Sequence, residues 1–183
     1  MKHPLGLVLL SLVLASCAGT LPYAADYPLT TETFLSRDGL LGGRIPRGWV
    51  FSSVDTLTPA LLAWLVKEDF SASLSLQELH LDRLSSERVG SEGLSLLARM
   101  SLQFQSDPAG AQLTAGPKEF KTGGKIFCGY EILAGGERKR VVVFAARGRY
   151  YECRAAPLKG LWSDAELARL FEAQQVMLSS LTF

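Results

Sequence analysis

The clearest alternation of apolar and polar positions lies at residues 125–156, in KIFCGYEILAGGERKRVVVFAARGRYYECRAA. Gly135 with Gly136, and Arg147 with Gly148, interrupt it, and both pairs are typical of two-residue hairpin turns. The pattern therefore predicts three consecutive antiparallel strands. The middle strand, VVVFAA, is apolar at successive positions, which is typical of a strand buried on both faces. We expect helices on both sides of this sheet.

The segments on either side predict further elements. Residues 44–55 (RIPRGWVFSSVD) predict a turn and a strand, and the apolar positions at 61–66 and 70–76 predict two more strands. Residues 91–106 carry apolar side chains at helical spacing. Ser163 and Glu166 form a capping box, with Trp162 and Leu167 as a hydrophobic staple, before a closing amphipathic helix. The predicted class is α+β, a largely antiparallel sheet with helices packed on both faces.

The first residues, MKHPLGLVLLSLVLASC, place a basic residue before the longest apolar run and small residues after it. This is the pattern of an export signal. The run is too short for a comfortable membrane-spanning helix, which needs about 20 residues. LASC resembles the lipobox of bacterial lipoproteins. The resemblance implies a signal peptide at residues 1–16 and lipidation of Cys17 with two or three acyl chains, which hold a membrane firmly. The alternatives are an ordinary cleaved signal and a short anchor with an incidental cysteine.

Ala18 follows the cysteine of this lipobox. Lipoproteins of bacteria with two membranes that stay at the inner membrane usually carry Asp at this position. The resemblance therefore implies a lipid-anchored protein of the cell envelope. In a host with two membranes, the expected location is the outer membrane, facing the periplasm.

Residues 17–43 mix Pro, Thr, Gly and polar residues with scattered apolar ones, which predicts a lipidated N-terminus and tether. Phe34, Leu35, Leu40 and Leu41 leave open the alternative that its second half packs on the domain. Residues 44–183 have the length of a single globular domain. The expected organisation is thus signal peptide, tether and one α+β domain.

Composition limits the classes of partner. Without the leader, which holds Lys2, the chain has 18 basic and 18 acidic residues. Near-zero net charge argues against nucleic acid as a partner. With 48% hydrophobic and 20% charged residues, the chain can bury a core.

The two cysteines that follow Cys17 lie in the predicted meander. Its turns place Cys128 opposite Val143, and Cys153 opposite Val142. Since successive strand positions face opposite sides of a sheet, the two thiols point away from each other, and we predict no disulfide between them. Neither lies at a helix start or in a Cys-x-x-Cys motif, so we expect two free core residues rather than nucleophiles.

No motif for catalysis or cofactor binding is found: GxSxG, HExxH, GxGxxG and the P-loop are all missing from the sequence. His80 is the one histidine after the leader, and no ligand-spaced cysteines or carboxylates accompany it. We therefore expect no catalytic residue, no metal, no cofactor and no enzymatic activity.

Five residues are candidates for contact with a ligand or partner. His80, Tyr130 and Tyr150 could line the lip of a cleft. Arg138 and Arg140 lie near the first hairpin turn, where Glu131 is expected to face Arg140 across the strands. The five are His80, Tyr130, Tyr150, Arg138 and Arg140. Arg147 and Arg149 lie at the opposite end of the middle strand, so these arginines do not form one basic patch.

The order of elements, with IPRGW early, RVVVFAARGRYYECRA late and an amphipathic helix last, resembles the PsbP-like α-β-α sandwich of photosystem extrinsic subunits and small accessory proteins. The resemblance implies a noncatalytic binding or assembly role. We expect a membrane-anchored accessory module that binds an envelope protein or complex through sheet-end loops or a free edge. The alternatives are a small-ligand-binding protein or enzyme that uses a cleft between the sheet and the helix at 91–106, and a spacer between membrane and cell wall.

Overall fold

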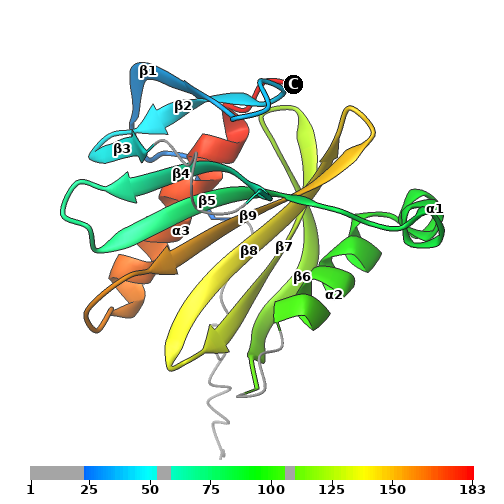
Figure 1. Ribbon diagram of the computed structural model, residues 1–183. Helices are drawn as coiled ribbons and strands as arrows, with labels where there is room; N and C mark the ends of the chain where they lie inside the picture. The colour runs from blue at the N-terminus through cyan, green and yellow to red at the C-terminus, as the bar shows by residue number, and fades with distance from the viewer. Residues whose placement is uncertain (1–22, 53–58, 106–109) are drawn as a thin grey trace, which may run out of the picture.

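A computed structural model describes residues 23–52, 59–105 and 110–183 (Figure 1). The strands in these ranges are β1 Leu29–Leu35, β2 Gly42–Pro46, β3 Trp49–Ser52, β4 Leu61–Lys67, β5 Ala72–Leu79, β6 Gln112–Thr122, β7 Lys125–Ala134, β8 Glu137–Ala146 and β9 Arg149–Pro157. The helices are α1 Arg83–Glu92, α2 Leu94–Gln105 and α3 Asp164–Ser179. Seven strands form one antiparallel sheet in the order β3-β4-β5-β9-β8-β7-β6, and β1 pairs with β2 in a small second sheet.

The predicted meander is confirmed as β7-β8-β9, with its register. Cys128 lies opposite Val143, and Val142 lies opposite Cys153. In the second hairpin turn both Arg147 and Gly148 have positive φ, of 50° and 74°. A two-residue turn of this kind matches the right-handed twist of the strands that it joins, which explains why the local sequence specified the pairing.

The sheet is covered on both faces, as its apolar middle strand requires. α3 packs against one face, where the larger core cluster contains Phe144, Tyr151 and Phe171. α1 and α2 cover part of the other face, over a smaller cluster that includes Leu97, Tyr130 and neighbouring side chains of β7 and β8. The predicted α+β class is therefore confirmed, with helices on both sides of the antiparallel sheet (Figure 1).

The closing helix begins as predicted. The Ser163 hydroxyl accepts a hydrogen bond from the Glu166 backbone N–H, and the Glu166 carboxylate accepts one from the Ser163 N–H. The buried residues of α3 include Leu167, Leu170 and Phe171, so its apolar side faces the core.

The segment before residue 44 differs from the prediction of a tether throughout 17–43. β1 lies within that segment and pairs with β2, which begins at Gly42, and the backbone of Gly42 pairs with that of Thr182. Phe34 and Leu41 are buried in the larger core. Together with Ile45 of β2, these two side chains pack the short sheet against the domain. For Phe34 and Leu41 the docking alternative holds, whereas Leu35 is exposed.

Candidate functional site

One end of the sheet carries a shallow groove, which we call the His80 groove. It consists of two adjoining hollows of about 300 and 160 Å³ that share residues Glu78, Leu79, His80 and Leu81. β5 ends here, α1 begins just beyond, and the C-terminal turn of α2 supplies Phe104 and Gln105. The β8–β9 turn and Tyr150 close the other side.

The floor of the groove is a buried carboxylate, Glu152, on β9. Its Oε1 accepts hydrogen bonds from Gln77 Nε2 at 3.0 Å, Gln105 Nε2 at 2.9 Å and Arg154 Nη2 at 3.0 Å. Ser101 on α2 donates to Oε2. Because a buried charge is stable only when paired and hydrogen-bonded, these four donors make Glu152 a structural tie between β5, β9 and α2.

Tyr130 lies behind this network rather than at the lip of the cleft, which corrects the expectation for this residue. It is fully buried, and its hydroxyl lies 2.7 Å from Ser101 Oγ. Since Ser101 gives its proton to Glu152, Tyr130 is the donor of that bond. Burial, with Glu152 nearby, raises the pKa of the Tyr130 phenol, so it stays protonated at neutral pH.

His80 and Tyr150 are brought together at the groove. The His80 side chain is 73% exposed, and its Nδ1 lies 3.8 Å from a Glu78 oxygen, a pair that is ionic only when the imidazole is protonated. The Tyr150 hydroxyl donates to the Ser86 carbonyl at 3.2 Å, which fixes the start of α1 against β9. His80 is therefore the more accessible of the two.

Arg138 and Arg140 lie on the other face of the sheet and are not part of the groove. Arg140 is completely buried under α3, where it donates to Phe171 O and to the side-chain oxygens of Gln174 and Gln175. Burial lowers its pKa to about 10. A surface contact role for Arg140 is therefore wrong, because the strand face that bears it is closed by the helix.

Arg138 is partly exposed and joins two carboxylates near α3. Its Nε lies 3.4 Å from Glu131, and its Nη1 lies 3.0 Å from Asp164. Glu131 faces Arg140 in the strand register, as predicted. These contacts give Arg138 a structural role that links the first hairpin to the start of α3.

Cys128 and Cys153 are free and buried, one in each core cluster. Burial raises the pKa of the Cys128 thiol to about 11 and that of the Cys153 thiol to about 12. Both are therefore protonated at neutral pH, which makes them poor nucleophiles and poor metal ligands. Within the described ranges, no group of three or more His, Cys, Asp or Glu side chains could hold a metal ion.

A second site, which the sequence did not suggest, lies at the opposite end of the sheet. This aromatic pocket has a volume of about 530 Å³. Its aromatic residues are Tyr27, Trp49 and Trp162, and its cationic residues include Lys67 and Arg169. These side chains come from segments far apart in the chain, so no single stretch of sequence contains a signal for the pocket.

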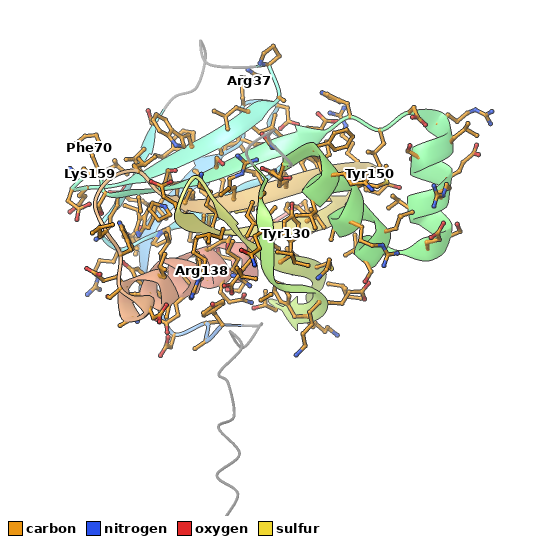
Figure 2. All side chains as sticks on the ribbon, turned by 90° about the horizontal axis from the view of Figure 1, so that it is seen from below. Arg37, Phe70, Tyr130, Arg138, Tyr150 and Lys159 are labelled. Atoms are coloured by element: carbon orange, nitrogen blue, oxygen red, sulfur yellow. The ribbon has the colours of Figure 1, made fainter. Side chains whose placement is uncertain are left out.

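The strand register shows that the two sites are at opposite ends. Ala72 pairs with Pro157 beside the aromatic pocket, and Leu79 pairs with Tyr150 at the His80 groove. Seven residues of strand span about 23 Å at ~3.3 Å each. Figure 2 shows the same separation, with Phe70 and Lys159 at one edge of the molecule and Tyr150 towards the other.

Comparison with known proteins bears on the fold. No protein-family model matches the chain. No curated protein matches its sequence at a significant level. Among solved structures, the solution structure of PsbP (CyanoP) from the cyanobacterium Synechocystis sp. PCC 6803 has a TM-score of 0.52 at 13% identity, over 82% of this chain and 91% of the other. The fold is that of the PsbP-like sandwich.

A second structure with this architecture is the Ran-binding protein Mog1p from Saccharomyces cerevisiae. Its TM-score is 0.53 at 12% identity, and the match covers 85% of this chain and 96% of Mog1p. At such identities the likeness concerns the PsbP-like architecture alone. Among the residues that the structure describes, no helix is long and apolar enough to cross a membrane.

Proposed function

We propose that this protein is a lipid-anchored, noncatalytic accessory module of the bacterial cell envelope that binds another envelope protein through the His80 groove. The anchor is the lipidated Cys17 of the LASC lipobox, and Ala18 favours the outer membrane of a host with two membranes. The observation that carries the binding role is the groove itself, an accessible hollow whose polar floor is held rigid by the Glu152 network.

The chemistry of the groove suits a protein partner. Phe104 is 76% exposed at its edge, in the same hollow as Arg154 and the imidazole of His80, and Tyr150 lines the adjoining hollow. Aromatic and arginine side chains are enriched in the cores of protein interfaces. The larger hollow, at about 300 Å³, is only at the lower limit of the volumes typical of small-molecule sites. A partner side chain inserted beside Phe104 fits better than an enclosed ligand.

Two further observations support a noncatalytic role. The buried carboxylate and its hydrogen-bonded neighbours all serve to hold the sheet and α2 together. The thiols of Cys128 and Cys153 are out of contact with solvent. The structural neighbour Mog1p is described as a Ran-binding protein, so the same architecture serves protein binding in another organism.

Site-specific photo-crosslinking in the host tests the proposal. A photoreactive amino acid replaces His80 or Phe104, and Ile126, which is 59% exposed on β7 outside the groove, serves as the matched control. We expect the same partner to be crosslinked from both groove positions and not from position 126. A partner captured equally from all three positions, or from none, contradicts the groove as the binding surface.

The intact mass of the protein recovered from host membranes tests the anchor separately. We expect loss of residues 1–16 and addition of two or three acyl chains at Cys17. A Cys17→Ser variant should lose the acyl mass and leave the membrane fraction. An uncleaved or unacylated chain contradicts the lipoprotein assignment.

A further inference from the structure

Large apolar side chains lie in solvent around the mouth of the aromatic pocket. Leu161 is fully exposed, Phe70 is 66% exposed and Leu158 is 45% exposed. We call these three residues the apolar rim. They come from the β4–β5 turn and from the loop before α3, which are joined by the hydrogen bond from Leu158 N to Ser71 O at 2.8 Å. Exposed apolar side chains gathered in one place mark a surface that is covered in use.

The loop that bears the rim has the sequence LKGLW, from Leu158 to Trp162. Gly160 has a φ of +81°, a conformation that other residues rarely adopt, and the turn it makes leaves Leu161 directed away from the domain. The Trp162 indole donates to Lys159 O at 3.0 Å, which closes the loop. Protruding Leu with neighbouring Lys and Trp is the combination that settles at a membrane–water interface.

The N-terminal segment enters the domain at the same end. Tyr27 lines the aromatic pocket, its ring lies 4.6 Å from the Arg169 guanidinium carbon, and its hydroxyl donates to Arg47 O at 3.1 Å. Tyr27 is ten positions after Cys17 in the chain. Even fully extended, that length of chain reaches only about 35 Å. A lipid on Cys17 therefore keeps the pocket end of the domain close to the bilayer.

The charges around the pocket indicate what kind of surface fits. Lys67 pairs with Asp69 at 3.1 Å, and Arg169 pairs with Glu172 at 2.8 Å. The pocket lining also contains Lys159 and Glu166, so three cations are mixed with acidic side chains. This end is therefore not a basic patch, and attraction to anionic headgroups is not the main force. The apolar rim is the feature that can bind, and burial of apolar area depends little on salt.

We infer that the apolar rim docks into the surface of the bilayer that holds the lipid anchor. In this orientation the β4–β5 turn and the LKGLW loop face lipid, and the His80 groove faces away from it, towards a partner. The inference rests on the proposed lipid anchor and adds a second contact with the membrane.

The test uses the full protein purified from host membranes and reconstituted into protein-free vesicles of phosphatidylethanolamine and phosphatidylglycerol. Leu161→Cys is labelled with an environment-sensitive dye, and Ile126→Cys, at the other end of the sheet, is the matched control. Cys128 and Cys153 are fully buried, so the folded protein takes the label at the new site. Lipids with a nitroxide near the headgroup then quench dye that enters the interface.

We expect the label at position 161 to be quenched at least about threefold more than the label at 126, with little change at about 0.5 M salt. A second variant, Leu161→Asp with the label at Lys159→Cys, should dock about tenfold more weakly than Lys159→Cys alone, because a charge replaces the inserted leucine. Leu161 is fully exposed, so this change leaves the fold intact.

Flotation of the vesicles separates the two proposals. If the chain floats with the vesicles but position 161 is quenched no more than position 126, docking is overturned and the anchor stands. If position 161 becomes protected only in native membranes that contain other proteins, the rim binds protein and lipid docking is overturned. If high salt releases the label from the vesicle surface, apolar docking is overturned. If the chain does not float, the anchor fails and docking fails with it.

Discussion

Tyr23 holds the N-terminal segment on the domain, and replacing it measures how firmly that segment is attached. Its hydroxyl donates to Glu131 Oε1 at 2.6 Å. Its ring meets that of Phe171 edge-to-face, with centroids 5.2 Å apart, and lies 5.0 Å from the guanidinium carbon of Arg140. Tyr23 thus covers a buried acid and a buried base.

The expected loss follows from these contacts. Tyr23→Phe removes a hydrogen bond to a carboxylate that is 2% exposed, and such bonds are worth about 2 kcal/mol. Without the Tyr23 hydroxyl, Glu131 still has its ion pair with the Arg138 Nε at 3.4 Å. Tyr23→Ala also removes the ring pair and the cation–π contact, at about 1 kcal/mol each. We therefore expect the free energy of unfolding to fall by about 2 kcal/mol in Tyr23→Phe and about 4 kcal/mol in Tyr23→Ala.

Urea unfolding of a Cys17→Ser chain, followed by tryptophan fluorescence, measures these losses. The slope of the free energy of unfolding against urea concentration should stay the same, because the surface exposed on unfolding changes little. Tyr27→Phe is the control, since its hydroxyl donates to Arg47 O at an exposed site and should cost less than about 1 kcal/mol. If both Tyr23 variants unfold within about 0.5 kcal/mol of the parent, the contacts of Tyr23 do not hold the segment on α3.

Three further predictions concern the fold that supports the sites. Ser163→Ala removes the capping box and should lower the free energy of unfolding in urea by about 1 kcal/mol, and an unchanged value would contradict the cap. Glu152→Ala leaves its four buried or half-buried donors without an acceptor and should cost about 3 kcal/mol in the same assay, whereas a loss under about 1 kcal/mol would mean that the donors find other partners. Burial raises the pKa of the Cys153 thiol from 9.0 to about 12, so the folded chain keeps a proton that the unfolded chain loses. The stability due to that proton is complete below pH 9 and is lost as the pH rises towards 12. In Cys153→Ala the free energy of unfolding should therefore fall less steeply over this range, by about 1.4 kcal/mol per pH unit. Parallel pH profiles for variant and parent would contradict this prediction.

The parts of the fold that were predicted correctly depend on short-range chemistry. Two two-residue turns set the register of β7, β8 and β9, because a hairpin of this kind leaves only one pairing for the strands. The start of α3 followed in the same way from Ser163 and Glu166, which lie one helical turn apart.

Elements with little apolar patterning were missed. In α1 only Val89 is buried, so the helix has no apolar stripe to detect. β6 is an edge strand with few buried positions and irregular pairing to β7, and its sequence does not alternate. Both elements are held by their neighbours rather than by their own pattern.

The candidate contact residues likewise differ in whether their position depends on local sequence or on distant segments of the chain. His80 is exposed at the groove, and Leu79 and Leu81 on either side of it pack against the smaller core cluster. Arg140 and Tyr130 were placed at the surface, although both are fully buried. A charged or polar side chain can be buried when partners far away in the chain satisfy it, and here those partners come from α3 and α2.

Local sequence was enough to predict the class of the fold, the meander with its register, the opposite orientation of the two thiols and the cap of the last helix. The register, the orientation of the thiols and the cap depend on residues that are neighbours in the chain or are related through tight turns, and the class follows from the order of the elements. The folded chain was needed to show that β1 and β2 belong to the domain, that Glu152 is the floor of a groove and that Leu161 lies beside the aromatic pocket. Those features bring together residues from distant segments, and their geometry depends on how the whole sheet and its helices pack.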